Sequence, residues 1–282
     1  MKRSLRIFIN VIAAVIMTVS CFGLVACKED IRTIEVNISV YNATDSEWQD
    51  HTMTVALYRH LAPTTVDKMI EYINDKHYDG SIFYKMDGYS SQIMVGDLKY
   101  DNGAIVQNTV RPLLKDGEFE LGGTIGSNLA AKKGSIGLWR SWNAHNNSYT
   151  FSADTGTARS TWFIPTTSIS SYDNYFCIFA QIDLDSEANS DAFAALEAAF
   201  GDGATTVSYE VYYTGTYDQE KADENHGLTY NCVEEDEFDE DEIENLFEAE
   251  NTELVCYNHY TIKVPVYQNT QIAARITSVT VK

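Results

Sequence analysis

This chain has few basic residues and few prolines, and its cysteines lack the spacings of metal-binding or redox motifs. Only 20 Lys and Arg residues stand against 41 Asp and Glu residues, which gives a formal net charge of −21. A surface of this sign repels nucleic acid and anionic lipid headgroups, so we expect no nucleic-acid partner. The five cysteines show no C-x-x-C or C-x-x-H spacing, which excludes the common zinc and redox motifs.

The rest of the composition favours a β-rich globular fold. Hydrophobic residues make up 44% of the 282 residues, which is enough apolar material for one large domain or two small ones. There are 18 tyrosines, frequent Val, Ile and Thr runs and only four prolines, a combination that is typical of strands. We therefore expect a mainly β protein.

Residues 1–26 have the pattern of a secretory signal peptide. They begin with three basic residues, continue with an apolar stretch from Ile7 to about Met17 and end in small residues. Leu24-Val25-Ala26-Cys27 resembles the lipobox of bacterial lipoproteins, in which Cys27 becomes the lipid-bearing N-terminus. The predicted location is the outer face of a Gram-positive cell membrane, held by a two-chain lipid anchor. The alternatives are an ordinary signal peptide with an incidental cysteine and an uncleaved transmembrane segment.

Cleavage at Cys27 makes the mature chain still more acidic. It removes three of the 20 basic residues and no acidic one, so 17 basic and 41 acidic residues remain, with a formal charge of −24. Of the three cysteines then left besides Cys27, Cys177 lies in an apolar run and is expected in the core. Cys232 and Cys256 flank an acidic stretch and could form a disulfide outside the cell.

Hydrophobic periodicity predicts two strands followed by a helix. Residues 31–43 and 51–60 alternate apolar and polar side chains, as in an antiparallel pair. Next, Pro63 suits a first helical turn, and the apolar residues behind it fall at i, i+3, i+4 and i+7, namely Val66, Met69, Ile70 and Ile73. We expect an amphipathic helix packed on the sheet.

Further short strands follow, bounded by turn residues. One is predicted at Ser135–Trp139, and later Ser190 and Asp191 are placed to cap a second helix that Gly201 ends. Two lone helices among many strands indicate a barrel or sandwich rather than βαβ repeats.

The segment from Ala222 to Ile262 has an unusual composition. It contains 14 acidic residues and no lysine or arginine, and a weak apolar stripe at 238–247 could form a short helix. We divide the chain into a signal peptide (1–26), a lipidated tether (27–32), a barrel (33–200), an acidic insertion (201–258) and closing strands (259–282). The insertion has no EF-hand glycine, and a solvated face is the default interpretation.

The order of these segments resembles the cyclophilins, a family of peptidyl-prolyl cis-trans isomerases. Four landmarks carry the resemblance: LYRHLAPTTVDKMIEYINDKHYDGSIFYK at 57–85, Gly96-Asp97, GEF at 117–119 followed by KKGSIGLWR at 132–140, and STWFI at 160–164 followed by CIFAQI. The resemblance implies a closed eight-stranded antiparallel β-barrel with two capping helices. It also implies proline-containing peptide segments as partners and a reaction that needs no metal or cofactor.

The resemblance also assigns candidate site residues. Cyclophilins twist the prolyl bond with the arginine of a Phe-His-Arg sequence, and the matching residue is Lys85. The candidate peptide-binding residues are Tyr89, Gln92, Met94, Trp139, Thr161, Phe163 and Phe176, with Tyr175 as an alternative to Phe176. A solvated strand-end lysine and a plain core phenylalanine are the alternatives for Lys85 and Phe163.

Three functions are therefore open at this point. The first is prolyl isomerisation during folding of secreted proteins, by a monomer whose activity is weakened by the missing arginine, glutamine and histidine. The second is a barrel without turnover that binds peptides or a surface partner. The third is an interaction module whose acidic insertion binds cations or basic secreted chains.

Overall fold

The computed structural model describes residues 30–86, 88–108, 129–140, 158–172, 176–201, 204–218, 228–234, 252–267 and 271–282. The chain divides into two compact units, Met1–Asp30 and Ile31–Lys282, and the fold below is that of the second. Several predictions concern residues outside the described ranges, namely the lipidation of Cys27, the role of Tyr175 and the helix at 238–247. No helix in the described ranges is long and apolar enough to cross a membrane.

The predicted first hairpin is present. β1 (Ile31–Asn42) and β2 (Glu47–Tyr58) pair in antiparallel register from Ile31 opposite Tyr58 to Asn42 opposite Glu47. The second strand starts earlier than predicted because the turn is short: the Asn42 side-chain oxygen accepts the backbone N–H of Thr44 at 2.9 Å.

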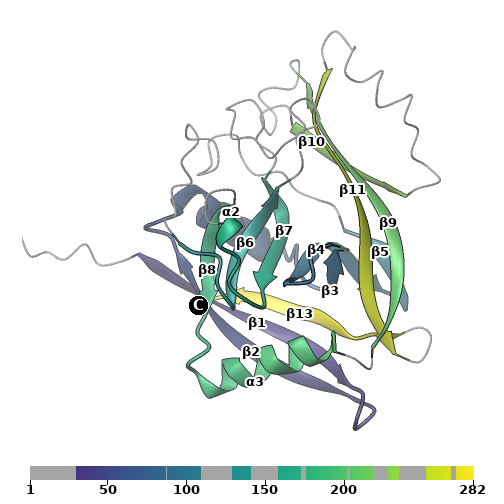
Figure 1. Ribbon diagram of the computed structural model, residues 1–282. Helices are drawn as coiled ribbons and strands as arrows, with labels where there is room; N and C mark the ends of the chain where they lie inside the picture. Colours follow the sequence, from purple (N-terminus) through teal and green to yellow (C-terminus); the bar gives the residue numbers. More distant parts are fainter. Residues whose placement is uncertain are drawn as a thin grey trace, which may run out of the picture. The chain divides into compact units, whose positions relative to one another are not determined.

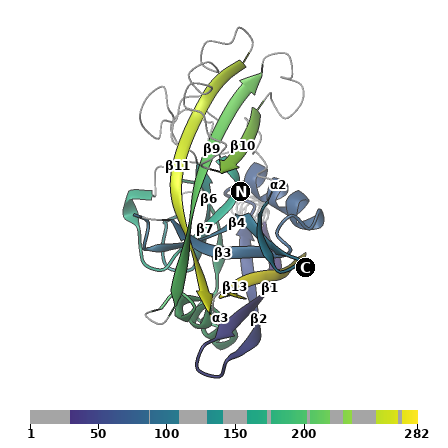
Figure 2. The ribbon, with the colours of Figure 1, turned by 90° about the vertical axis from the view of Figure 1, so that its right-hand side faces the viewer.

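The predicted amphipathic helix is α2 (Pro63–Asn74), with Pro63 in its first turn. Its buried face carries Val66, Met69 and Ile73, as the spacing predicted, while Ile70 is only partly buried. The second helix, α3 (Glu187–Ala198), packs against β2. Figure 1 and Figure 2 both show α3 beside the β1–β2 hairpin.

The prediction that Ser190 and Asp191 cap α3 is wrong. The helix begins after Ser186, whose backbone is extended, and Glu187 places a negative charge in the first turn. Asn189 is buried inside this turn and anchors it to β2, accepting the Thr54 N–H at 2.8 Å and donating to the Thr54 carbonyl at 3.1 Å. This tertiary contact extends the helix toward its N-terminus.

Eight antiparallel strands form a closed barrel (Figure 1), as predicted. The pairings run β3-β13-β1-β2-β8-β6-β7-β4 and return to β3, because β3 also pairs with β4. The strands beside the hairpin are β3 (Ser81–Met86), β4 (Gln92–Asp101), β6 (Ser135–Arg140), β7 (Ala158–Pro165), β8 (Ile178–Ile182) and β13 (Ala274–Val281). A short strand, β5 (Ala104–Gln107), pairs with β4 outside this circuit. Closure leaves the circuit without a free edge.

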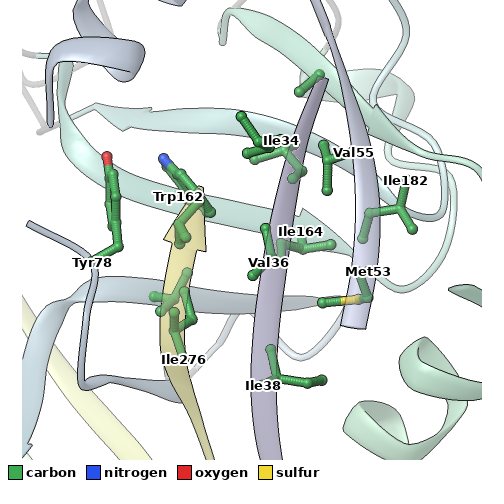
Figure 3. Close-up of a cluster of buried hydrophobic side chains, with 14 of the residues drawn as sticks. Ile34, Val36, Ile38, Met53, Val55, Tyr78, Trp162, Ile164, Ile182 and Ile276 are labelled. Carbon is green, nitrogen blue, oxygen red and sulfur yellow. The ribbon is translucent and has the colours of Figure 1, made fainter. Parts of the chain in front are cut away.

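Alternating side chains of these strands fill the barrel interior (Figure 3). Ile34, Val36 and Ile38 of β1 point inward and are at most 2% exposed, and Trp162 of β7 lies in the same cluster. Tyr78 packs on Trp162 with ring centroids 4.2 Å apart and donates its hydroxyl to the Ser160 carbonyl at 2.9 Å. Each fully buried apolar side chain of this kind contributes about 1.5–3 kcal/mol.

A further sheet is inserted between α3 and β13. It contains β9 (Thr205–Asp218), β10 (Leu228–Glu234), β11 (Thr252–Tyr267) and β12 (Gln271–Ile272), with β9 between β10 and β11. β11 joins the barrel through Ile262 opposite Met86 and Lys263 opposite Lys85. Residues 259–267, predicted among the closing strands, thus lie in β11, and β13 closes the barrel.

The predicted Cys232–Cys256 disulfide stays a prediction. Cys232 on β10 is opposite Tyr213 of β9, and Cys256 on β11 is opposite Gly215 of the same strand. The side chains of both cysteines lie outside the part of the chain that the structure describes.

Candidate active site

The apolar candidate site residues lie on the outer face of the barrel wall. Tyr84 of β3 pairs with Met94 of β4, and Met94 pairs with Phe163 of β7, which gives one row across three strands. These three side chains belong to a second buried cluster, whereas their neighbours Phe83 and Val95 belong to the barrel interior. Strand alternation thus separates an inner core from an outer apolar layer.

Five aromatic rings in this outer layer form what we call the aromatic cluster: Tyr89, Trp139, Phe163, Tyr172 and Phe176. Phe176 stacks on Trp139 with ring centroids 5.0 Å apart and planes inclined at 19°. Phe163 meets Phe176 edge-on at 5.1 Å, and Tyr89 meets Trp139 edge-on at 5.2 Å. Such stacked and edge-to-face pairs are favourable beyond the area that they bury.

Gly137 on β6 makes room for this cluster. A Cβ atom at Gly137 would lie 2.3 Å from Cζ of Phe163, so the phenylalanine ring occupies the space that any side chain there would need. Gly137 is also the residue directly opposite Phe163 in the β6–β7 pairing. The glycine in SIGLWR therefore fixes where Phe163 lies.

Tyr172 is a member of the cluster that sequence reasoning missed. It ends a short 3₁₀ helix at Ser170–Tyr172, and its ring centroid lies 4.5 Å from that of Phe176 and 5.4 Å from that of Phe163. Burial, and to a smaller extent Tyr89, raise the pKa of its hydroxyl. The only signal in the sequence is its spacing four residues before Phe176, within a serine-rich stretch that reads as a loop.

The rings differ in exposure. Trp139 and Phe163 are 0% exposed and Phe176 is 2% exposed, while Tyr89 and Tyr172 are half-buried. The two tyrosines are therefore the members of the cluster with solvent-accessible surface.

Gln92 and Thr161 are buried polar residues next to this layer. Gln92 donates its amide to the Met94 sulfur at 3.2 Å, and its side-chain oxygen has no hydrogen-bond partner in the described residues. Thr161 donates its hydroxyl to Asp97, and Tyr84 donates to the other oxygen of the same carboxylate. Thr161 is thus held in a buried network with Asp97.

Lys85 lies on the opposite face of β3 from Tyr84 and Met86. Its Nζ lies 5.4 Å from the centroid of the Phe200 ring, at the end of α3. Partial burial lowers the pKa of Lys85, and the negative charge of Glu197 partly offsets this effect. The structure therefore brings Tyr89, Met94, Trp139, Phe163 and Phe176 into one layer and places Lys85 outside it.

A small pocket of about 120 Å³ opens beside β8. Its lining residues are Tyr58, Leu129, Ala130, Lys132, Ile178, Ala180 and Gln181. Pockets that bind small ligands usually measure roughly 300–1,000 Å³, so this one is small. In the described ranges, no group of three or more His, Cys, Asp or Glu side chains is arranged to hold a metal ion.

Comparison with known proteins identifies the family. A family profile described as "Cyclophilin type peptidyl-prolyl cis-trans isomerase/CLD" matches residues 43–210, more than half of the chain. The chain belongs to this cyclophilin family. The matched range contains the described cyclophilin strands from β2 to β8 and both helices.

Solved cyclophilin structures are similar at a low level. One is the cyclophilin-type peptidyl-prolyl cis-trans isomerase of Cryptosporidium parvum, at 14% identity and a TM-score of 0.35, with 60% of this chain and 83% of that chain covered. A structure of that protein in the presence of the dipeptide Ala-Pro is 12% identical, with a TM-score of 0.32 and coverages of 55% and 83%. No curated protein sequence matches the chain.

Proposed function

We propose that this cyclophilin handles proline-containing segments of secreted proteins outside the cell membrane and isomerises them weakly. The aromatic cluster is the observation that carries this proposal. It provides an apolar, ring-lined layer on the barrel wall, and the sequence resemblance aligns Phe163 in that layer with the family's pocket phenylalanine. A proline ring is apolar and packs well against aromatic faces.

Prolyl isomerisation requires an apolar surface for the proline ring and a well-placed hydrogen-bond donor. Rotation about a peptide bond has a barrier of about 18–20 kcal/mol, and an X-Pro bond flips spontaneously over tens to hundreds of seconds. A catalyst holds the proline and its flanking carbonyls and aims a donor at the prolyl nitrogen. An acceleration of roughly 10⁴ corresponds to about 5.5 kcal/mol, which requires a well-placed, desolvated donor.

The position of Lys85 supports weak activity. To donate to a peptide on the aromatic cluster, its ammonium has to leave the Phe200 ring and cross to the other face of β3. Lysine also lacks the planar fork with which arginine braces itself while it donates. Lys85 remains our candidate donor, and both features predict a slower reaction than an arginine would give.

The second candidate function is peptide binding without turnover. It is favoured by the burial of Trp139 and Phe163, which have no exposed surface. A peptide would then displace Tyr89 and Tyr172 and lie on the rings, with no donor acting on the prolyl nitrogen. Both candidates use the same layer, so one experiment separates them.

NMR exchange spectroscopy on a short Ala-Pro peptide measures this reaction at equilibrium. The proteins compared are the wild type, Lys85→Gln and the control Lys76→Gln, an exposed lysine after α2. We expect exchange above the uncatalysed rate in the wild type and the control, and loss of it in Lys85→Gln. Unchanged exchange in Lys85→Gln would remove Lys85 as donor. Saturable binding without added exchange would establish the second candidate, and no binding would overturn the proposal.

The extracytoplasmic location is proposed from the signal-like start and from Cys27 behind Leu24-Val25-Ala26. We expect the chain to be a lipid-anchored monomer in the membrane fraction. Replacing Cys27 by Ser should abolish incorporation of labelled fatty acid and release the protein into the medium. Equal labelling of wild type and Cys27→Ser would contradict the lipid anchor.

A further inference from the structure

Arg275 lies between two aromatic rings on the outer face of the barrel. Its Cζ is 5.6 Å from the ring centroid of Trp48 and 5.7 Å from that of Tyr100. The strand order β2-β1-β13-β3-β4 explains this geometry. Arg275 is on the middle strand, β13, while Trp48 comes from β2 and Tyr100 from β4, each two strands away. Directly beside Arg275 on the neighbouring strands are Ser39 and Ile82.

The rings are themselves held in place. Tyr41, which is 7% exposed, meets Trp48 edge-on at 5.7 Å, and the ring of Tyr267 lies 5.1 Å from that of Tyr41. The Tyr100 backbone N–H donates to the Gly80 carbonyl at 2.9 Å. A planar guanidinium held between fixed rings is ordered in advance, which lowers the entropy that a ligand must overcome.

The charge of Arg275 is not neutralised within the described residues. It forms no ion pair there, and its Nε is buried without a hydrogen-bond partner. Its Nη groups also have no partner in those residues and are not among the buried unpartnered atoms, so they keep some access to solvent. A buried donor without a partner is unusual, because buried donors are nearly always paired. It is more unusual in this chain, which has 41 acidic residues and a net charge of −21.

We propose that Arg275, Trp48 and Tyr100 form a binding site for a carboxylate carried by a peptide. The outward Nη edge of a guanidinium matches the two oxygens of a carboxylate, which it binds through two parallel hydrogen bonds. The flanking rings offer apolar contact to the peptide around that group. The acidic surface of the rest of the chain disfavours polyanions, so a single carboxylate on an otherwise uncharged peptide is the ligand that fits.

This site and the aromatic cluster lie at different places on the same outer layer, against which Trp48 and Tyr100 also pack. Tyr100 lies six residues beyond Met94 on β4, which corresponds to at most about 20 Å along the strand. The site therefore requires neither isomerase activity nor proline, and probe peptides without proline test it independently of the proposed function.

The test is an NMR titration of the ¹⁵N-labelled mature protein, following the Arg275 side-chain Nε–H signal. Three short proline-free peptides serve as probes at constant ionic strength. The first has a free C-terminal carboxylate, the second is the same peptide with an amidated C-terminus, and the third is amidated and contains one internal glutamate. The protein variants are Arg275→Lys and the control Arg59→Gln, which removes an arginine already paired with Asp67 at 2.6 Å.

We expect the Nε–H signal to shift saturably with at least one carboxylate peptide and not with the peptide that has none. The first and third probes decide whether a chain end or an acidic side chain is the source. Arg275→Lys keeps the cation but loses the fork, so it should weaken binding about tenfold or more, while Arg59→Gln should not. No saturable shift with either carboxylate peptide, or equal shifts with all three, would overturn the proposal. The wild-type titration decides this even if a variant fails to fold.

Discussion

Phe176 stacks on Trp139 at a centroid distance of 5.0 Å, and this pair forms the centre of the aromatic cluster. One ring comes from the strand β6 and the other from the start of the run that leads into β8. The contact therefore joins two chain segments that are separated in the sequence. The outer layer of the barrel wall is therefore packed, and it contributes to the stability of the fold.

The first prediction concerns that pair. Phe176→Ala removes a buried ring and leaves a cavity next to Trp139. The free energy of unfolding should therefore fall by about 3–5 kcal/mol. Urea denaturation measures this change. Tyr172→Phe keeps a ring in contact with Phe176 and should change stability little, and a similar loss in both variants would contradict a specific role of the stacked pair.

The second prediction concerns the contact between Gly137 and Phe163. Gly137→Ala places a methyl group where the Phe163 ring lies, so it should destabilise the fold by about 1–3 kcal/mol through overpacking. Phe163→Leu shortens the opposing side chain, and the double variant should recover part of that loss. A double-mutant cycle measures the coupling. Strict additivity of the two effects would show that the ring does not occupy the space over Gly137.

The third prediction concerns the buried carboxylate of Asp97. It accepts hydrogen bonds from Tyr84 and Thr161 on its two oxygens. Asp97→Asn replaces one acceptor by a donor and leaves a buried group unsatisfied, which should cost about 1–3 kcal/mol of unfolding free energy. Asp101→Asn, at the exposed end of β4, is the matched control. Equal stability of the two variants would contradict the network.

The fourth prediction concerns the pH dependence that Lys85 confers. Partial burial lowers its pKa in the folded state below the usual value of 10.5, so between those two pKa values the unfolded chain binds more protons. Stability should therefore rise with pH in that window, because the cost of partly burying the ammonium disappears as it deprotonates. Lys85→Met lacks this contribution, and its stability advantage over the wild type should shrink as the pH rises through the lowered pKa of Lys85 toward 10.5. A difference that stays constant over this range would contradict the burial of Lys85.

The fifth prediction concerns the inserted sheet. Tyr212 and His259 are directly opposite each other in the β9–β11 pairing. Replacing residues 213–258 by an Asn-Gly turn keeps the pairing of residues 205–212 with residues 259–266. An Asn-Gly turn is suited to a hairpin. The barrel should still fold, with a melting temperature close to that of the wild type. Loss of folding would show that the removed residues support the barrel, and unchanged partner binding would remove the interaction-module hypothesis.

Local sequence patterns predicted the elements whose packing is simple. The alternation in β1 and the i, i+3, i+4, i+7 spacing in α2 follow directly from one buried face. The closed barrel was predicted only through the family resemblance, since no local pattern specifies that β3 and β4 complete a circuit. The start of α3 was misplaced because Asn189 is held by β2, a contact that the local capping pattern does not reveal.

The residues of the candidate site were predicted better than the directions in which their side chains point. Phe163, Trp139 and Phe176 were named from their positions in the sequence, and the structure brings them together. The direction of Lys85 could not be predicted, because side chains alternate along a strand and a shift of one residue moves each side chain to the opposite face. Tyr172 was missed because its place in the cluster depends on a short 3₁₀ turn with no apolar periodicity.

Two indole signals offer the most direct test of the central claim that prolyl peptides bind at the aromatic cluster. Trp139 lies in the cluster, whereas Trp162 lies in the barrel interior with its indole N–H 3.4 Å from the Met69 sulfur. Adding an Ala-Pro peptide to the ¹⁵N-labelled protein should shift the Trp139 indole signal saturably and leave that of Trp162 unchanged. An unchanged Trp139 signal at saturating peptide, or equal shifts of both indoles, would contradict the account.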